Sequence, residues 1–532
     1  MMDAAPVSGL DTRSGEYCRR VIATLPVTNV AAAHPALESL LRAMHLAPPP
    51  AAEYLGVLES AREALAFLQE AMASRYASKP LPASAEETTA FERTVGLWRL
   101  MADSYARVAQ LGGGDATMDQ KLALVCQRCI HYAGQSIIEY YRARRAVKAG
   151  LWLDLHGYYD TAEDWGLASQ GVSEPLDEDT GTVTCATTYA TALLVDLANP
   201  YSRTSKELAL IVRWARQMSP LTTIARTDDS GGGRGYGVDL MQDRGLLPVE
   251  QLAASATARL FNTASLGEFV QRLLTGLKAG QTPVSLGLGD CAKAQAARLL
   301  LHLYRPWCLA ALPRRFQRNQ ASGSLAVAYD PDAIYFHVAG REFEQPAHVR
   351  SFSRSEVDSM VTFGSMVESA KPVSLQTAQR DHALDHWEIV DQSPHGYRVL
   401  RKSAGPRIEH GQLLLALKAP DAKQFVLGRV TWLMQDRDGS LQTGIQVLPH
   451  PAAAVGVRPT GLSIAATEKY TRAFFLPAVP AQKEPVSVVL PTGWYSPGRI
   501  VEVFTNRQVS IRLGELIIQG SNFERCTFTL VQ

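Results

Sequence analysis

Neither sign of charge is in excess in this sequence of 532 residues, which holds 53 Lys and Arg against 52 Asp and Glu. General nucleic-acid binders carry a basic face, so this balance argues against DNA as a partner and makes any anion site local. Long apolar runs are also missing, since no stretch approaches the roughly 20 residues that cross a bilayer. The first residues lack the basic-then-apolar order of a secretory signal. We therefore expect no membrane span.

Cysteine is scarce, with seven residues that are odd in number and scattered along the chain. This pattern fits reduced thiols in a cytoplasm better than a disulfide framework. Cys126 and Cys129, followed by His131, lie in an apolar helical segment without a second pair of ligands, so we interpret the cysteines as structural. His382 and His386 precede a strand, and no Glu completes a metalloprotease motif. We expect no metal and no cofactor.

The first three hundred residues carry the periodicity of helices. In the segment 52–76, for example, Leu55, Leu58, Leu65 and Leu68 form one apolar stripe. A chain of this length exceeds a single core, and we assign 1–310 to a helical bundle with hairpin-like pairs. A break near 221–248, with two short strands beside a glycine-rich loop, divides it into two possible subdomains. Helices are predicted over 52–76, 86–111, 117–148, 151–168, 185–218, 266–279 and 290–306.

The period changes near residue 323, where the segment 323–339 alternates and is rich in β-branched and aromatic residues. From there the chain predicts strands and turns at the short spacing of small antiparallel barrels. The fold class is thus multidomain α+β, with an all-α N-terminal bundle, a β-barrel and a second small β-rich domain. The predicted bounds are 311–460 for the barrel, with an insertion at about 341–380, and 461–532 for the last domain.

Two short patterns stand out at the junction between the two halves. Arg314 and Arg318 form an Arg-x-x-x-Arg pair just before the first strand, and Asp391, Ser393 and Gly396 form Asp-x-Ser-x-x-Gly between two later strands. In this order they resemble the signature of PilZ domains, a family of cyclic di-GMP receptors. The segments Gly428–Trp432 and Gly444–Val447 look like the paired late strands of that barrel. The resemblance covers roughly residues 312–460.

The resemblance implies a site for cyclic di-GMP in which arginines hold the phosphates and stack on the bases, as guanidinium chemistry allows. The Asp-x-Ser-x-x-Gly turn would then read guanine, with Asp391 accepting hydrogen bonds from it. A second pair, Arg350 and Arg354, lies closer to Asp391 in sequence and remains a rival to the first. The predicted ligand-binding residues are Arg314, Arg315, Arg318, Asp391, Ser393 and Gly396, followed by Arg350 and Arg354.

The leading hypothesis is a signalling effector, not an enzyme, whose barrel binds cyclic di-GMP and whose helical region binds a protein partner or forms a homo-oligomer. One alternative is an interaction scaffold whose barrel has lost its ligand, which predicts that the arginines and Asp391 do not converge. The second is an enzyme with a site in the helical half near 228–239, which predicts a deep polar pocket there. No nucleophile elbow, kinase motif set or dinucleotide fingerprint supports the enzyme.

Overall fold

The computed structural model describes residues 12–177, 181–226, 235–309, 319–345, 382, 384–417, 425–460, 469–505 and 508–531. The chain divides into two compact units. The first comprises residues 1–79 and 83–313, and the second comprises 80–82 and 314–532. None of the helices in the described ranges is both long and apolar enough to span a membrane.

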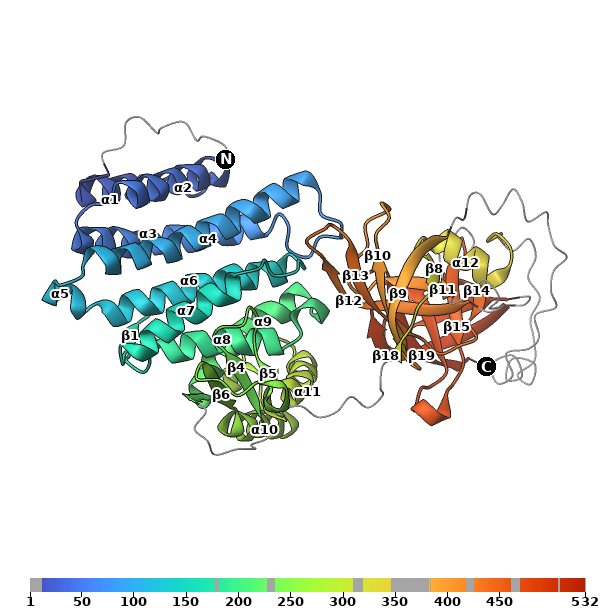
Figure 1. The fold of residues 1–532 in the computed structure, drawn as a ribbon. Coiled ribbons are helices and arrows are strands. Elements are labelled where there is room, and N and C mark those ends of the chain that lie inside the picture. The colour runs from blue at the N-terminus through green and yellow to red at the C-terminus, as the bar shows by residue number, and fades with distance from the viewer. Residues whose placement is uncertain are drawn as a thin grey trace. The chain divides into compact units, whose positions relative to one another are not determined.

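The first unit is helical, as the periodicity predicts, and its longest helices lie side by side in an up-and-down stack (Figure 1). Polar capping residues determine where several of the helices begin. Ser84 and Glu87 form a reciprocal capping box on α4, and Thr204 and Glu207 do the same on α9. The helices are α1 Gly15–Ala23, α2 Val30–Leu46, α3 Ala51–Ala73, α4 Ala85–Leu111, α5 Ala116–Asp119, α6 Leu122–Arg142, α7 Leu151–Asp164, α8 Cys185–Leu197, α9 Ser205–Met218, α10 Ala264–Lys278 and α11 Lys293–Cys308.

Short strands interrupt the helical unit, some of them in the region of the predicted break near 221–248. A four-stranded antiparallel sheet has the order β3-β6-β4-β5, and a separate pair joins β1 to β2. Helices before and after this sheet in the chain contribute to one apolar core that includes Trp214 and Trp307, both fully buried. The strands are β1 Val172–Ser173, β2 Thr182–Val183, β3 Thr223–Arg226, β4 Tyr236–Asp239, β5 Leu247–Pro248 and β6 Ala258–Asn262.

The second unit begins with a closed antiparallel barrel. Its sheet has the order β10-β13-β12-β11-β8-β9-β7, and an additional pairing of β10 with β9 closes six of these strands into a ring. The predicted strands of this region are confirmed, including the pairing of the two late strands β12 and β13. The strands are β7 Asn319–Gln320, β8 Ser324–Ala328, β9 Asp385–Ser393, β10 Gly396–Arg401, β11 Leu413–Leu417, β12 Val426–Gln435 and β13 Leu441–Val447.

One element of this barrel was predicted wrongly. The alternating segment 323–339 continues past β8 not as strand but as the helix α12, Pro331–Ala339. Asp330 caps this helix, since its side chain accepts hydrogen bonds from the backbone N–H groups of Asp332 and Ala333, and Pro331 occupies the first turn. The Asp-Pro step is a helix start signal that outweighs the alternation.

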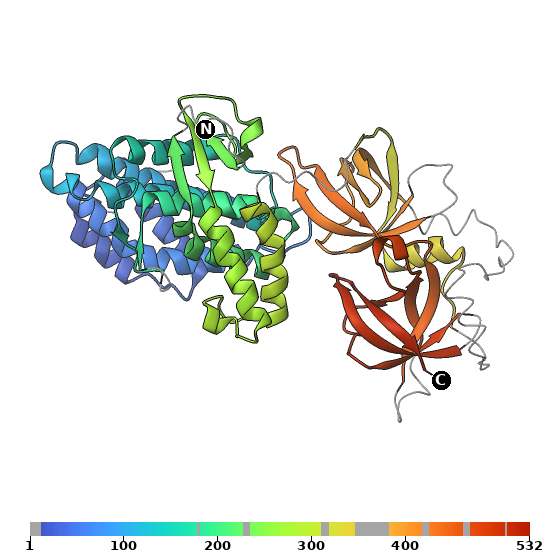
Figure 2. The same ribbon diagram turned by 90° about the horizontal axis from the view of Figure 1, so that it is seen from below.

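A second six-stranded closed barrel ends the chain, with the order β14-β15-β16-β19-β18-β17 (Figure 2). It begins with β14 at Ala453, before the predicted boundary at 461. An apolar cluster within this unit joins α12 to strands of both barrels through Ile334, Leu415, Phe474 and Phe523. The strands are β14 Ala453–Pro459, β15 Thr471–Leu476, β16 Ser487–Pro491, β17 Ile500–Phe504, β18 Gln508–Gln519 and β19 Phe523–Leu530.

Candidate functional site

The Asp-x-Ser-x-x-Gly motif forms the tight hairpin between β9 and β10. Asp391 and Ser393 end β9, Gly396 begins β10, and a two-residue turn joins the strands. The Ser393 hydroxyl donates a weak hydrogen bond of 3.4 Å to the Gly396 carbonyl. The motif therefore lies at one end of the barrel with its Asp and Ser half-buried. The predicted arginines lie outside the described residues: Arg314, Arg315, Arg318, Arg350 and Arg354.

The short strand β7 connects the first arginine pair to this hairpin. Asn319, which directly follows Arg318 in the sequence, is the register partner of Gln392, and Gln320 is the partner of Asp391. Some seventy residues separate these partners along the chain. The backbone that follows the first arginine pair is therefore hydrogen-bonded alongside the Asp-x-Ser-x-x-Gly motif.

A β-bulge decides which way Asp391 faces. Val399 on β10 pairs with Ile389, and both are buried in the barrel. The next residue, Arg398, pairs with Asp391, so Val390 is an extra residue on β9. Without the bulge, Asp391 would follow Ile389 into the core, because residues two apart share a face of a strand. The extra residue places it on the outer face instead, a known use of bulges.

Arg398, Gly444 and Trp432 share this outer face with Asp391, and none of them was predicted as a site residue. Across the strands, Asp391 is followed by Arg398, then Gly444, then Trp432, as successive register partners. A second bulge, between Val430 and Trp432, places Trp432 outside, just as the first places Asp391. Adjacent strands are about 4.8 Å apart, so this first outer row extends roughly 14 Å.

A parallel second outer row lies two residues from the first on β9, β10 and β13, and three residues from it on β12, where the bulge adds one. Ser393 pairs with Gly396, Gly396 with Gln446, and Gln446 with Arg429. The Arg429 Nε donates to Gln446 Oε1 at 2.8 Å, which holds that guanidinium over the row. The two rows therefore bring Arg398 and Arg429 to the same face as the motif. Strand periodicity could have paired these arginines, but the bulges that align them leave no clear signal in the sequence.

Glycine is required at the centre of both rows. A Cβ on Gly396 would lie 2.1 Å from the Ile445 carbonyl oxygen, and a Cβ on Gly444 would lie 1.9 Å from Trp432 Nε1. The indole therefore lies close over the bare backbone of Gly444. The guanidinium carbon of Arg398 is 6.0 Å from the centre of the Trp432 ring, and its Nη2 donates to Gln442 at 2.7 Å. Arginine beside an indole offers both charge and a flat stacking surface.

The outer rows have the chemistry for a ligand that combines anionic and aromatic groups. The outer rows carry two guanidinium groups, of Arg398 and Arg429, and one carboxylate, of Asp391. Their local net charge is therefore positive although the whole chain is nearly neutral. Trp432 supplies an aromatic surface for a base. Asp391 supplies an acceptor for the N–H groups on a guanine edge, and Ser393 a hydroxyl. A guanine nucleotide presents the groups that these side chains complement.

Cys126 and Cys129 of the helical unit have the environment of core residues. Both thiols are buried on α6, and the free thiols show no disulfide among the described residues. Burial raises the pKa of the Cys126 thiol to about 11 and that of Cys129 well above its ordinary value. Burial thus disfavours the reactive thiolate form of both side chains, as is usual for structural core cysteines.

This environment predicts the order in which the thiols react. With Ellman's reagent at pH 8, the partly exposed Cys291 and Cys308 should react before the five buried cysteines, which include Cys126 and Cys129. A thiol with a pKa near 11 is only about one part in a thousand thiolate at that pH. In denaturant all seven should react together. Rapid labelling of Cys126 or Cys129 in the native protein, mapped by mass spectrometry, would contradict the structural interpretation.

The region near 228–239, proposed for an enzyme site, is described only from residue 235. There Asp239 is buried and accepts hydrogen bonds from the Thr257 hydroxyl and the Met241 N–H, so its contacts are structural. Among the described residues, the carboxylates of Asp160, Glu163 and Asp164 lie close enough together to hold a metal ion. Arginines already neutralise it, since Arg259 pairs with Glu163 at 2.7 Å and Arg226 with Asp164 at 2.7 Å.

Comparison with known proteins finds relatives at both ends of the chain. Residues 16–228 match the family described as the N-terminal domain of the cyclic-di-GMP receptor FimW, and residues 455–531 match the FimW C-terminal β-barrel domain. A curated protein of Pseudomonas aeruginosa, named cyclic-di-GMP receptor FimW, is 26% identical over 427 residues. That similarity covers 72% of this chain and 68% of the relative. The first barrel lies between the two matched ranges, and the matches together indicate a family of cyclic-di-GMP receptors.

Proposed function

We propose that this protein, a relative of the FimW receptors at both ends of its chain, is a cyclic di-GMP receptor that acts as a signalling effector. The relative's name, cyclic-di-GMP receptor FimW, supports cyclic di-GMP as the ligand. The outer rows of the first barrel support that barrel as the binding site. The observation that carries the assignment is the pairing of β7 with β9, which brings the chain after Arg318 alongside Asp391. The first barrel is thus proposed as PilZ-like in function.

The proposed contacts are of two kinds, one for the phosphates of the ligand and one for its guanine bases. Arg314, Arg315 and Arg318 bind phosphates and stack on a guanine. Asp391 accepts hydrogen bonds from a guanine edge, and Ser393 adds a polar contact. Arg398 and Trp432 extend this surface along the first outer row. The β7 pairing supports the pair at 314 and 318, because it places the backbone that follows this pair beside the motif.

The proposed output is a change in how the helical region binds a partner protein. The arginine segment joins the two units in sequence, so a ligand that holds it against the barrel would constrain that junction. A ligand shifts such an equilibrium only by its different affinity for the two arrangements. The helical region is accordingly proposed as the surface for a protein partner or a second copy of the chain, and the cytoplasm as the site of action.

Calorimetric titration of the full chain with cyclic di-GMP tests this proposal. Arg318→Ala and Asp391→Ala should each weaken binding by about 10- to 100-fold, because a hydrogen bond to a charged group contributes about 1.5–3 kcal/mol. No binding by the wild-type protein would refute the ligand and favour the scaffold. Unchanged binding in both variants would refute the residue assignment while leaving the ligand in place.

Two further variants make the result specific. Lys402→Ala removes an exposed positive charge from the same barrel, where it pairs with the exposed Glu388, and should leave the affinity within about twofold. Arg354→Ala tests the rival pair directly. A large loss in Arg354→Ala with none in Arg318→Ala would transfer the assignment to 350 and 354.

A further inference from the structure

A cavity of about 220 Å³ opens within the helical unit, among helices α3, α6, α8 and α9. All of its lining residues fall in the N-terminal range shared with the FimW family, and none belongs to the barrel site. Small-molecule pockets usually measure about 300–1,000 Å³. This cavity is therefore sized for a compact ligand, smaller than a molecule with two nucleotides.

Most charges in the cavity wall are already compensated by one another. The buried Glu174 accepts from Arg62 Nη2 at 2.7 Å and from Arg128 Nη1 at 2.8 Å. At the other end, Arg142 pairs with Glu70 at 2.7 Å and with Glu139 at 3.1 Å. These ion pairs hold the side chains of the wall in place, and the charges within each pair largely cancel.

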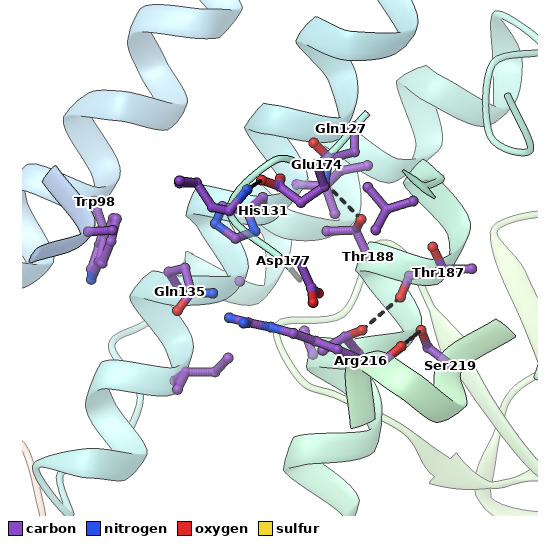
Figure 3. A pocket seen from close by; sticks show the side chains of 18 of the residues that line it. Trp98, Gln127, His131, Gln135, Glu174, Asp177, Thr187, Thr188, Arg216 and Ser219 are labelled. Carbon is purple, nitrogen blue, oxygen red and sulfur yellow. Dashed lines mark hydrogen bonds between the residues drawn. The ribbon is translucent and has the colours of Figure 1, made fainter. Parts of the chain in front are cut away.

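Arg216 on α9 is different, because its guanidinium makes no hydrogen bond or ion pair with any residue that the structure describes. Figure 3 shows this side chain reaching into the cavity, below His131 and toward the amide of Gln135. The Gln135 amide likewise has no hydrogen bond to a described residue. Arg216 is only partly buried, so water can solvate its guanidinium in the absence of a ligand, and its five N–H donors are open to an anionic partner.

Two neighbouring side chains, Arg62 and His131, also carry N–H groups that can donate hydrogen bonds. Arg62 is almost fully buried, and its Nη1 has no hydrogen-bond partner in the described chain beyond an ion-pair distance of 3.7 Å to Glu59. Burial, followed by the charges of Arg62 and Arg216, lowers the pKa of His131 well below its ordinary range. A neutral imidazole still offers one N–H. Arg216, Gln135, Arg62 and His131 thus line one small space, which Asp177 also lines.

Ile130, Ile138, Leu176 and Val183 supply apolar wall beside these donors. A bare inorganic ion would leave that wall without contacts, whereas a short carbon skeleton would fill it. We infer that this cavity is a second binding site, separate from the cyclic di-GMP site, for a compact metabolite with an oxyanion group, with Arg216 as its anchor. The oxyanion is a carboxylate or a phosphate ester.

Titration calorimetry of the full chain with succinate, glycerol 3-phosphate and inorganic phosphate separates these sources. Succinate or glycerol 3-phosphate should bind, and should bind more tightly than inorganic phosphate. Arg216→Ala should weaken that binding by about 10- to 100-fold, while Arg216→Lys should retain part of it. Lys206→Ala, which removes an exposed charge from the same helix outside the cavity, should leave it unchanged. Cyclic di-GMP binding should persist in Arg216→Ala, and an unchanged far-ultraviolet circular dichroism spectrum would show that its helical unit is folded.

Three results would overturn the inference. If none of the probes binds at about 10 mM, which is 10-fold above the roughly millimolar dissociation constants of weak ligands, the cavity is not an oxyanion site. Equal binding by wild type and Arg216→Ala would place any anion elsewhere. Displacement of a bound probe by cyclic di-GMP would make the cavity part of the dinucleotide site rather than a separate one.

Discussion

Glu174→Ala is expected to destabilise the helical unit by about 3–5 kcal/mol. Glu174 connects two arginines that are almost entirely buried, Arg62 and Arg128, whose side chains are 3% and 1% exposed. Removing the carboxylate would leave these guanidinium groups with Glu59 as their only carboxylate partner in the described chain. An uncompensated buried charge costs far more than the net contribution of the intact pair.

Urea unfolding followed by far-ultraviolet circular dichroism checks this expectation, since the helices dominate that signal. Glu16→Ala is the matched control, because its ion pair with Arg20 is exposed and 3.9 Å long and should contribute well under about 1 kcal/mol. Glu174→Gln, which keeps the shape and an acceptor oxygen, should fall between the two. Equal midpoints for Glu174→Ala and the control would mean that water reaches these arginines.

Gly396→Ala is expected to destabilise the first barrel by about 1–3 kcal/mol and to weaken cyclic di-GMP binding at the same time. The added methyl would meet the Ile445 carbonyl oxygen at 2.1 Å, and a backbone atom cannot rotate away as a side chain can. The hairpin would have to shift relative to β13. Asp391 and Ser393 belong to that hairpin, so their alignment with the outer rows would be lost.

Gly405→Ala provides the comparison within the same barrel. There the nearest atoms to a new Cβ, on Arg401 and Asp385, lie at an ordinary 3.5 Å, so stability and affinity should stay close to wild type. Thermal unfolding and calorimetric titration of both variants decide the matter. A Gly396→Ala protein that binds normally would show that the hairpin can shift without cost to the site.

Much of the fold was predictable because its signals are local. Apolar stripes and helix caps determine the long helices, and alternation with short turns determines the strands of both barrels. The prediction failed at α12, where Asp330 and Pro331 start a helix inside an alternating segment. It also placed β14 outside the last barrel, because the partners of that strand, β15 and β17, lie later in the chain.

The site was predictable only in part, for a physical reason. The hairpin motif carries its own signature, and the structure places Asp391 beside β7. Arg398, Arg429 and Trp432 were missed because their shared face depends on two bulges, and a single inserted residue reverses the face of every residue beyond it. The arginine pair at 314 and 318 stays a prediction, since it lies outside the described residues.

The closure of both barrels limits how this protein can pass on a signal. Each ring pairs every one of its strands on both sides, so the described strands of the two rings leave no continuous open edge to which a partner could add a strand. Recruitment by β-strand addition, a common way to bind extended peptides, is therefore disfavoured on the barrels. Recognition there must instead use side-chain surfaces and loops. It follows that point substitutions on the surface can separate partner binding from folding, which they rarely do when the partner completes a sheet.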